Sequence, residues 1–392
     1  MLTYTGRVPR LLPQRKLLVV IASLVLSACA LPAGAAAKSA LDREMQALVR
    51  MPGGPPGIAV TIQRGGRPEF HAAGVAQLGT SRRWRPGDHM RLASTSKAFS
   101  GAVALSLVAE GKLSLDDPVG SVLPWLPKAW QGVTVAEALN HTSGLPDYSS
   151  SKRFLSVLVK DLHAYFAPRR LVGFIAAEPL RFAPGSDYEY SNTDNVVIGL
   201  IAQAIDGHPY SQVLDERVSG PLHLAATTLP NGFRIPKPFV HGYDLDPPAA
   251  PEDVSTLFGM SSAWASGGIS SSVADLNRFI RGYLGARLFG TAAQDRQLRF
   301  VAGKSDPPGP GANAAGLAVF RYETPCGTVY GHTGNIFGYT QFAAATRGGE
   351  RSVTVSVNGQ ITPSSKLAVV RRAFAALRRL ESQAVCAALA GR

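Results

Sequence analysis

Apolar residues recur every three to four positions after residue 98, which is the period of a helix with one buried face. The recurring positions are Phe99, Val103, Leu107 and Val108. Gly111 closes this run and Asp117-Pro118 stops it, so we predict an amphipathic helix that starts near Ser94. A second apolar helix is predicted from near Thr193, after a Pro-Gly turn, and a third through Arg371 to Leu389.

Strand-like segments lie toward both ends of the chain. Gly57 to Val75 predicts two strands with a turn at Gly65-Gly66. Segments 340–346 and 352–357 flank an Arg-Gly-Gly-Glu turn, which predicts a hairpin. We therefore expect an α/β fold in which strands from both chain ends share one sheet, with a mainly helical region inserted between them at roughly 95–320.

A hydroxyl and an amine lie one helical turn apart at the start of the first helix. Residues three apart share a helical face, so the Lys97 amine can reach the Ser94 hydroxyl. Free N–H groups at the helix end can stabilise an oxyanion, and the pattern favours acyl transfer. The spacing recurs at Ser149 and Lys152, in a serine-rich loop with no apolar helix behind it, so Ser94 is the favoured nucleophile.

Two further polar groups are predicted to lie in loops beside this pair. Tyr190 and Asn192 precede the second helix; a phenol near an ammonium can transfer protons, and an amide can bind a substrate carbonyl. The alternative is a turn in which Asn192 caps the helix. Residues 331–335 read Gly-His-Thr-Gly-Asn, and a glycine-flanked strand permits close approach of a peptide-like substrate to backbone N–H donors.

In this order the three motifs resemble the signature of the penicillin-recognising serine hydrolases. The LNHTSGLPDY segment at Leu139–Tyr148 and Trp264 before Gly267-Gly268 match that signature further. The resemblance runs from about Gly57 to Cys386 and is closest to the serine D-alanyl-D-alanine carboxypeptidases related to class C β-lactamases. It implies a β-lactamase/transpeptidase-like fold with an antiparallel sheet.

The resemblance also implies a role for each motif residue. Ser94 would be acylated, Lys97 would help to deprotonate it, and Tyr190 would carry the proton to the leaving amine and later from water. The implied substrate-binding residues are Asn192 for the substrate amide, Trp264 as a wall of the cleft, His332 in the position of a lysine, Thr333 for a carboxylate, the adjoining Gly334, and Asn335 for an oxyanion-binding N–H.

The identity of the general base stays open at this stage. Lys97 and Tyr190 both have ordinary pKa values of about 10. Burial would lower the pKa of Lys97, whereas a neighbouring ammonium would lower that of Tyr190. His332 stands where class C β-lactamases carry a lysine, so a permanent positive charge is replaced by one that depends on pH. A separate arginine is therefore expected to bind the substrate carboxylate. Arg321 is the nearest candidate, and the alternative is an exposed strand arginine.

The N-terminus predicts export. An apolar run from Leu17 to Ala30 follows a basic segment and is too short to span a bilayer comfortably, as in a signal peptide. Leu-Ser-Ala-Cys ending at Cys29 resembles the bacterial lipobox, so we expect a periplasmic or extracytoplasmic protein with a lipid anchor at Cys29. The alternative is ordinary cleavage near residues 35–37. We expect 1–37 to be signal and tether, and 38–392 to form a single catalytic domain.

Cysteine use agrees with export. Without Cys29, two of the three cysteines remain, Cys326 and Cys386, and an even pair in an oxidising compartment is expected to be joined. The carboxypeptidase group includes members with a similarly placed pair. The bridge would tie the C-terminal helix to the sheet edge; two free buried cysteines are the alternative.

Composition narrows the function classes. The formal charge of +13 is spread along the sequence, which is not typical of a nucleic-acid footprint. None of the eight histidines forms a metal-binding pattern, so neither a metal nor another cofactor is expected.

The favoured function is an exported D-alanyl-D-alanine carboxypeptidase acting on cell-wall peptides. The alternatives are a carboxylesterase of the same fold, a class C-like β-lactamase and, in a different class, a non-catalytic penicillin-binding or wall-binding protein. Expected partners are peptide-like or ester substrates, including peptidoglycan and β-lactams, and a membrane through the lipid anchor.

Overall fold

The computed structural model describes residues 39–245 and 249–391. The predicted signal segment, tether and Cys29 lie outside the described residues. Contacts divide the chain into Met1–Lys38 and Ser39–Arg392, and the fold described below belongs to the second unit. None of the helices in the described ranges is long and apolar enough to cross a membrane.

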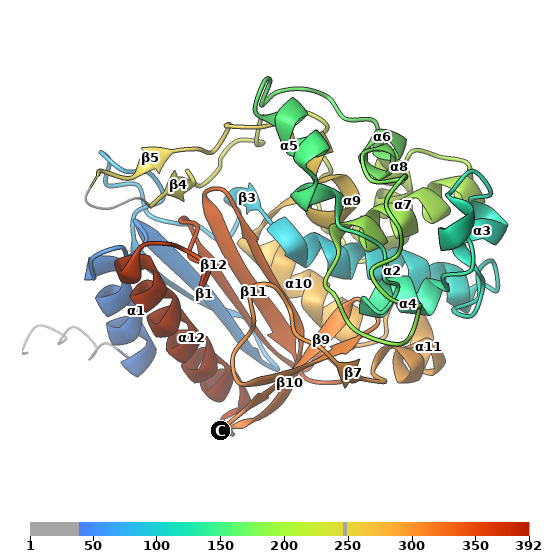
Figure 1. Cartoon of the computed structure of the whole chain (residues 1–392). Helices are drawn as coiled ribbons and strands as arrows, with labels where there is room; N and C mark the ends of the chain where they lie inside the picture. The colour runs from blue at the N-terminus through green and yellow to red at the C-terminus, as the bar shows by residue number, and fades with distance from the viewer. Residues whose placement is uncertain (1–38, 246–248, 392) are drawn as a thin grey trace, which may run out of the picture. The chain divides into compact units, whose positions relative to one another are not determined.

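In the described part of the chain, an eight-stranded antiparallel sheet runs in the order β2-β1-β12-β11-β10-β9-β8-β7 (Figure 1). Its strands are β1 (Gly57–Arg64), β2 (Glu69–Gly74), β7 (Val301–Ala302), β8 (Ala312–Gly316), β9 (Val319–Thr324), β10 (Gly327–Ile336), β11 (Tyr339–Ala345) and β12 (Arg351–Val357). Val60 of β1 lies opposite Val355 of β12, so the first and last strands are neighbours. The predicted sheet from both chain ends is confirmed.

Helices cover both faces of this sheet (Figure 1). α1 (Ala40–Arg50) and α12 (Ala368–Leu389) pack together on one face, while α10 (Val273–Leu284) contacts β11 and β12 on the other. Successive residues of β11 serve the two faces in turn. Phe342 belongs to the core that includes α1 and α12, and Ala343 belongs to the core that includes α10.

The remaining helices form the inserted region and its surroundings. They are α2 (Ser96–Ala109), α3 (Val119–Val122), α4 (Val135–Asn140), α5 (Lys152–Leu158), α6 (Pro168–Gly173), α7 (Asn192–Asp206), α8 (Tyr210–Leu214), α9 (Trp264–Gly267) and α11 (Gly290–Gln297). Two short ladders pair β3 (His89–Arg91) with β6 (Ser270–Ser272), and β4 (Tyr243–Asp244) with β5 (Glu252–Asp253).

α2 differs from its prediction in one respect. Every residue from Ser96 to Leu107 is buried, so the helix is surrounded on all sides and is not amphipathic. α7 and α9 both pack against it. Small residues such as Ala98 and Gly101 let neighbours approach α2 closely; a Cβ on Gly101 would come 2.2 Å from the Cβ of Ala318.

A disulfide joins Cys326 to Cys386, with their Cα atoms 5.2 Å apart. Cys326 lies in the turn between β9 and β10, and Cys386 lies in α12. The expected pairing is therefore present, although it reaches a hairpin between two interior strands instead of an edge strand.

Candidate active site

Lys97 is the buried centre of the candidate site. Its side chain is fully covered, and Nζ lies 3.1 Å from Ser94 Oγ, 2.7 Å from Asn192 Oδ1 and 2.8 Å from the carbonyl oxygen of Ser266. Ser94 lies in a 3₁₀ turn at Ala93–Thr95, directly before α2, and is partly exposed. The predicted reach of Lys97 to Ser94 is therefore present in the structure.

The partners of Lys97 suit a neutral amine. A neutral amine has two N–H groups and one lone pair, and the oxygens of Asn192 and Ser266 can only accept. When the amine is neutral, these two acceptors use both N–H groups and leave its lone pair for the Ser94 hydroxyl; when it is protonated, the third N–H donates to Ser94 Oγ. Burial lowers the pKa of Lys97 to about 7, although the nearby negative charges of Asp147 and Asp306 raise it in part.

Asn192 is held in place by groups behind it. Its Nδ2 donates to Asp147 Oδ2 and to Ser149 Oγ, both at 3.0 Å. Because a carboxylate can only accept, Asp147 fixes which end of the Asn192 amide faces Lys97. Ser191 caps α7 by accepting from the N–H of Thr193, so Asn192 is the first residue of the helix and not its cap. Asn192 thus orients the lysine in the structure.

The second Ser-x-x-Lys spacing does not form a catalytic pair. Ser149 Oγ bonds to Asp147 and Asn192, whereas Lys152 is exposed. Ser149 therefore supports Asn192 and has no base of its own.

Tyr190 lies beside the pair. Lys97 Nζ is 4.9 Å from the centroid of the Tyr190 ring, and the phenol oxygen is buried without a hydrogen bond of normal geometry. Burial raises the pKa of Tyr190 well above its usual value, although Ser94 lies close enough to lower it in part. Of the two candidate bases, Lys97 is the one whose pKa moves toward neutrality.

A buried cluster behind Tyr190 was not singled out for a role from the sequence. His141 Nδ1 lies 2.7 Å from Asp194 Oδ2, and Ser143 Oγ donates to Asp194 Oδ1 at 2.5 Å. Burial lowers the pKa of His141 to about 3, so this ring is neutral at ordinary pH, and burial raises the pKa of Asp194 well above its usual value. The His141 ring packs 4.5 Å from that of Tyr190. The sequence signal was the LNHTSGLPDY segment itself, which contains His141 and Ser143.

His332 carries no charge at neutral pH. It is buried in β10, its Nδ1 lies 2.6 Å from the carbonyl oxygen of Thr333, and its Nε2 has no partner among the described residues. Burial, together with the charge of Lys97, lowers the pKa of His332 to about 3. The expected conditional charge is therefore wrong. Thr333 Oγ1 donates to the carbonyl oxygen of Pro307 at 2.7 Å, so this hydroxyl is already occupied.

β10 lies against the nucleophile through a free edge. β9 pairs with residues 327–331 of β10, whereas residues 332–336 pair with β11 on one side only. A Cβ on Gly334 would come 2.5 Å from the carbonyl oxygen of Leu92 and 3.1 Å from the backbone nitrogen of Ser94. Only glycine permits this approach. The side chain of Asn335 donates to Thr340 and Ile361, which leaves its backbone as the expected oxyanion-binding part.

These groups surround a cleft of about 400 Å³. Ser94, Tyr190, Asn192 and Asn335 line it. Its apolar wall consists of Phe154, Leu155, Leu158, Phe258, Ile336 and Phe337. Among its described lining residues the only charged side chain is Asp306, and no arginine, lysine or histidine lines it.

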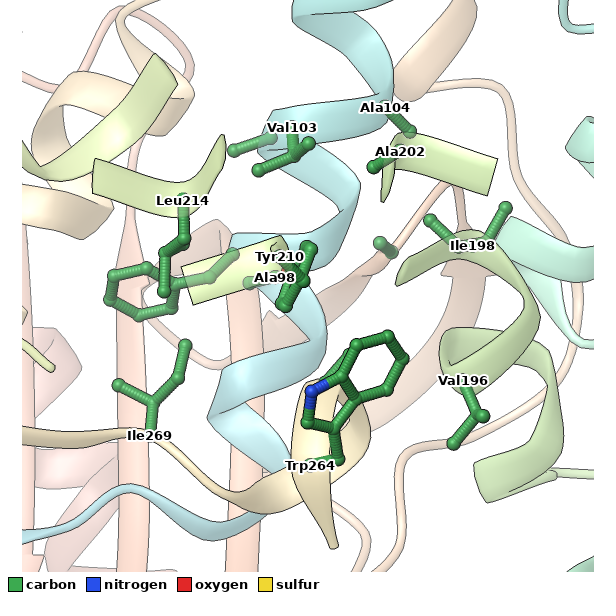
Figure 2. Close-up of a cluster of buried hydrophobic side chains, with 14 of the residues drawn as sticks. Ala98, Val103, Ala104, Val196, Ile198, Ala202, Tyr210, Leu214, Trp264 and Ile269 are labelled. Carbon is green, nitrogen blue, oxygen red and sulfur yellow. The ribbon is translucent and has the colours of Figure 1, made fainter. Parts of the chain in front are cut away.

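Besides the β10 residues His332, Thr333 and Gly334, two predicted substrate-binding residues, Trp264 and Arg321, are absent from the lining of this cleft. Trp264 is buried in the core with Ala98, Val196 and Tyr210, as Figure 2 shows, and the centroid of its indole lies 5.2 Å from that of the Tyr210 ring, at a tilt of 57°. The expected wall of the cleft is therefore wrong for Trp264, because packing against α2 and α7 covers its ring. Arg321 is half-exposed on β9, where it pairs with Glu323, so it matches the alternative of an exposed strand arginine.

Comparisons with known proteins agree with this architecture. The sequence profile of the beta-lactamase family matches residues 41–377. Protein flp of Staphylococcus aureus (strain MRSA252) is 27% identical over 233 residues, which is 58% of this chain and 45% of that protein. The chain thus spans about half the length of the curated relatives that it matches.

Solved structures match over more of the chain. A D-stereospecific amidohydrolase from Streptomyces sp. is 30% identical with a TM-score of 0.72, covering 85% of this chain and 97% of that one. A D-amino acid amidase from Ochrobactrum anthropi SV3 is 22% identical with a TM-score of 0.75, covering 88% and 99%, and supports the fold alone. The expected β-lactamase/transpeptidase-like fold is confirmed.

Proposed function

Since this chain belongs to the beta-lactamase family, we propose that it is a serine hydrolase that opens amide bonds through an acyl-enzyme on Ser94. The observation that carries the proposal is the Lys97 amine, whose pKa is about 7 and whose Nζ lies 3.1 Å from Ser94 Oγ. A neutral amine at this distance is a general base within direct reach of the nucleophile.

In the acylation step, Lys97 takes the proton of Ser94, and Oγ forms a bond to the substrate carbonyl carbon. The resulting oxyanion accepts hydrogen bonds from the backbone N–H groups of Ser94 and Asn335. When the C–N bond breaks, the leaving nitrogen takes the phenol proton of Tyr190, which the Lys97 ammonium replaces. A high pKa suits Tyr190 to this role, because the phenol holds its proton until the nitrogen becomes basic.

Deacylation reverses these transfers with water in place of the amine. Lys97, neutral again, takes a proton from water, and the hydroxide attacks the acyl carbon. The Ser94 ester bond then breaks, and its oxygen recovers the proton.

The cleft favours an amidase over the D-alanyl-D-alanine carboxypeptidase expected from the sequence. A carboxypeptidase must hold the terminal carboxylate of its substrate, and no cationic side chain lines the described cleft. The likeness to an amidohydrolase at 30% identity supports the same choice. Activated esters should also acylate Ser94, because an ester carbonyl reacts through the same steps.

Export and a lipid anchor at Cys29 are further proposals that rest on the N-terminal sequence alone. Both proposals are tested by measuring the mass of the N-terminal peptide of the mature protein from a bacterial membrane fraction. A diacylated N-terminal cysteine would support the anchor, and an unmodified N-terminus near residues 35–37 would contradict it.

Peptide mapping after reaction with an activated phenyl ester tests the nucleophile. We expect one acyl group on Ser94, its loss in Ser94→Ala and its persistence in Ser150→Ala, which changes an exposed serine nearby. An acyl group on Ser149, or none on any serine, would contradict the proposal.

A further inference from the structure

Asp306 is an acid without a partner in the cleft. The chain has a formal charge of +13, yet the only charged side chain that lines the described cleft is negative. Asp306 makes no hydrogen bond or ion pair with any described residue and is exposed. Its charge raises the pKa of both Lys97 and Tyr190, so it acts within electrostatic reach of the reacting groups.

The loop that carries Asp306 is fixed on both sides. Ser305 is buried and accepts from the backbone N–H of Gly309 at 3.2 Å and from the hydroxyl of Tyr322 at 3.2 Å. Pro307 is buried too, and its carbonyl oxygen accepts from Thr333 of β10. Because Ser305 and Pro307 are both anchored, the backbone of Asp306 is held at the cleft. Its carboxylate has no partner among the described residues.

We propose that Asp306 binds a positively charged amine of the substrate, so that the preferred substrates are amides of amino acids or peptides with a free ammonium group near the scissile bond. This inference rests on the proposed amide hydrolysis at Ser94. An ammonium in the cleft would form a charge-assisted hydrogen bond with Asp306, whereas a substrate carboxylate would be repelled.

The apolar part of the lining completes the description of the substrate. Leu155, Phe258 and Phe337 are apolar members of the lining, and the residues Leu155 and Phe337 are 42% and 44% exposed. Exposed apolar side chains at a cleft mark a binding surface for an apolar group. The cleft therefore suits an amide whose acyl part carries an ammonium and a bulky apolar side chain, such as phenylalanine amide.

The test compares three amides at pH 7, at which most α-amino groups are protonated. They are racemic phenylalanine amide, its N-acetyl derivative and its N-succinyl derivative. We expect the wild type to prefer the free amine by about tenfold or more in kcat/KM, as a charged hydrogen bond provides. Asp306→Asn should remove this preference without slowing the N-acetyl amide, and Asp306→Lys should favour the N-succinyl amide.

Asp215→Asn is the matched control, because it neutralises an exposed acid that does not line the cleft. It should leave all three rates unchanged. Equal rates for the free and acetylated amides, unaffected by Asp306→Asn, would overturn the role of Asp306 and leave the proposed amide hydrolysis intact. If no amide is cleaved, the inference about Asp306 fails. The assignment of Ser94 as the nucleophile fails as well only if the activated phenyl ester also leaves Ser94 unmodified.

Discussion

The chemistry at residue scale depends on one lysine being neutral at ordinary pH. Ser94 and Lys97 could be paired from the sequence, because residues three apart share a helical face. The choice between Lys97 and Tyr190 could not be made there, since it depends on burial. The structure covers Lys97 completely and supplies two acceptors, Asn192 and Ser266, that leave the lone pair of a neutral amine for Ser94.

We expect the charge of Asp147 to raise the pKa of Lys97. Burial is the main cause of the lowered pKa of Lys97, and the Asp147 charge opposes it. Asp147→Asn removes that opposition, so the pKa of Lys97 should fall, and the rise of kcat/KM with pH should move to lower pH. The measurement is the pH profile with a neutral ester. A profile that stays in place, or moves to higher pH, would contradict this role, and Asp187→Asn serves as a control outside the cleft.

At the scale of elements, the site depends on how closely β10 approaches the turn before α2. The glycine-flanked strand was predictable, and so was the neighbouring hairpin of β11 and β12, because β-branched segments and a Gly-Gly turn mark that hairpin. The positions of Trp264, His332 and Arg321 were not, since they depend on which helix or strand covers each side chain. Asp306 had no signal in the sequence, because its loop reaches the cleft only through the packing of its neighbours against β10 and β9.

Gly334→Ala tests the contact between β10 and the nucleophile. The added Cβ would meet backbone atoms of Leu92 and Ser94, so the strand or the turn must shift. We expect kcat/KM to fall by about 100-fold or more, as a displacement of about 1 Å in an active site does. Gly173→Ala is the control, because no heavy atom outside the adjoining residues and the backbone of its own helix lies within 4 Å of the added Cβ. Equal activity of the two variants would show that the approach is not required.

At the scale of the molecule, both chain ends contribute to one sheet, and this was predictable because strand patterns flank a helical middle. The complete burial of α2 could not be predicted. Its alanine, glycine and serine residues allow packing on every side, but they do not form a strongly apolar sequence. The cysteine pairing could be predicted from the even pair that remains without Cys29 and from the expected export, whereas its attachment to the β9–β10 turn required the structure.

Removal of the disulfide should lower the stability of the fold and leave the catalytic activity unchanged. It closes a separation of 60 residues, for which the chain-entropy model gives about 4 kcal/mol. The double variant Cys326→Ser/Cys386→Ser should therefore unfold at a lower denaturant concentration, while kcat/KM at 25 °C stays near that of the wild type, because neither cysteine lines the cleft. An unchanged unfolding midpoint would contradict the stabilising role.

The most direct test of the central claim is the rate of Ser94 acylation as a function of pH, followed by intact-protein mass spectrometry with a neutral activated ester. The account predicts a rate that rises with pH and reaches half of its maximum near pH 7, the pKa of Lys97. The same experiment on Lys97→Met should give a rate several orders of magnitude lower with no such rise. An acylation rate that is independent of pH around 7, or unchanged in Lys97→Met, would show that Lys97 is not the base.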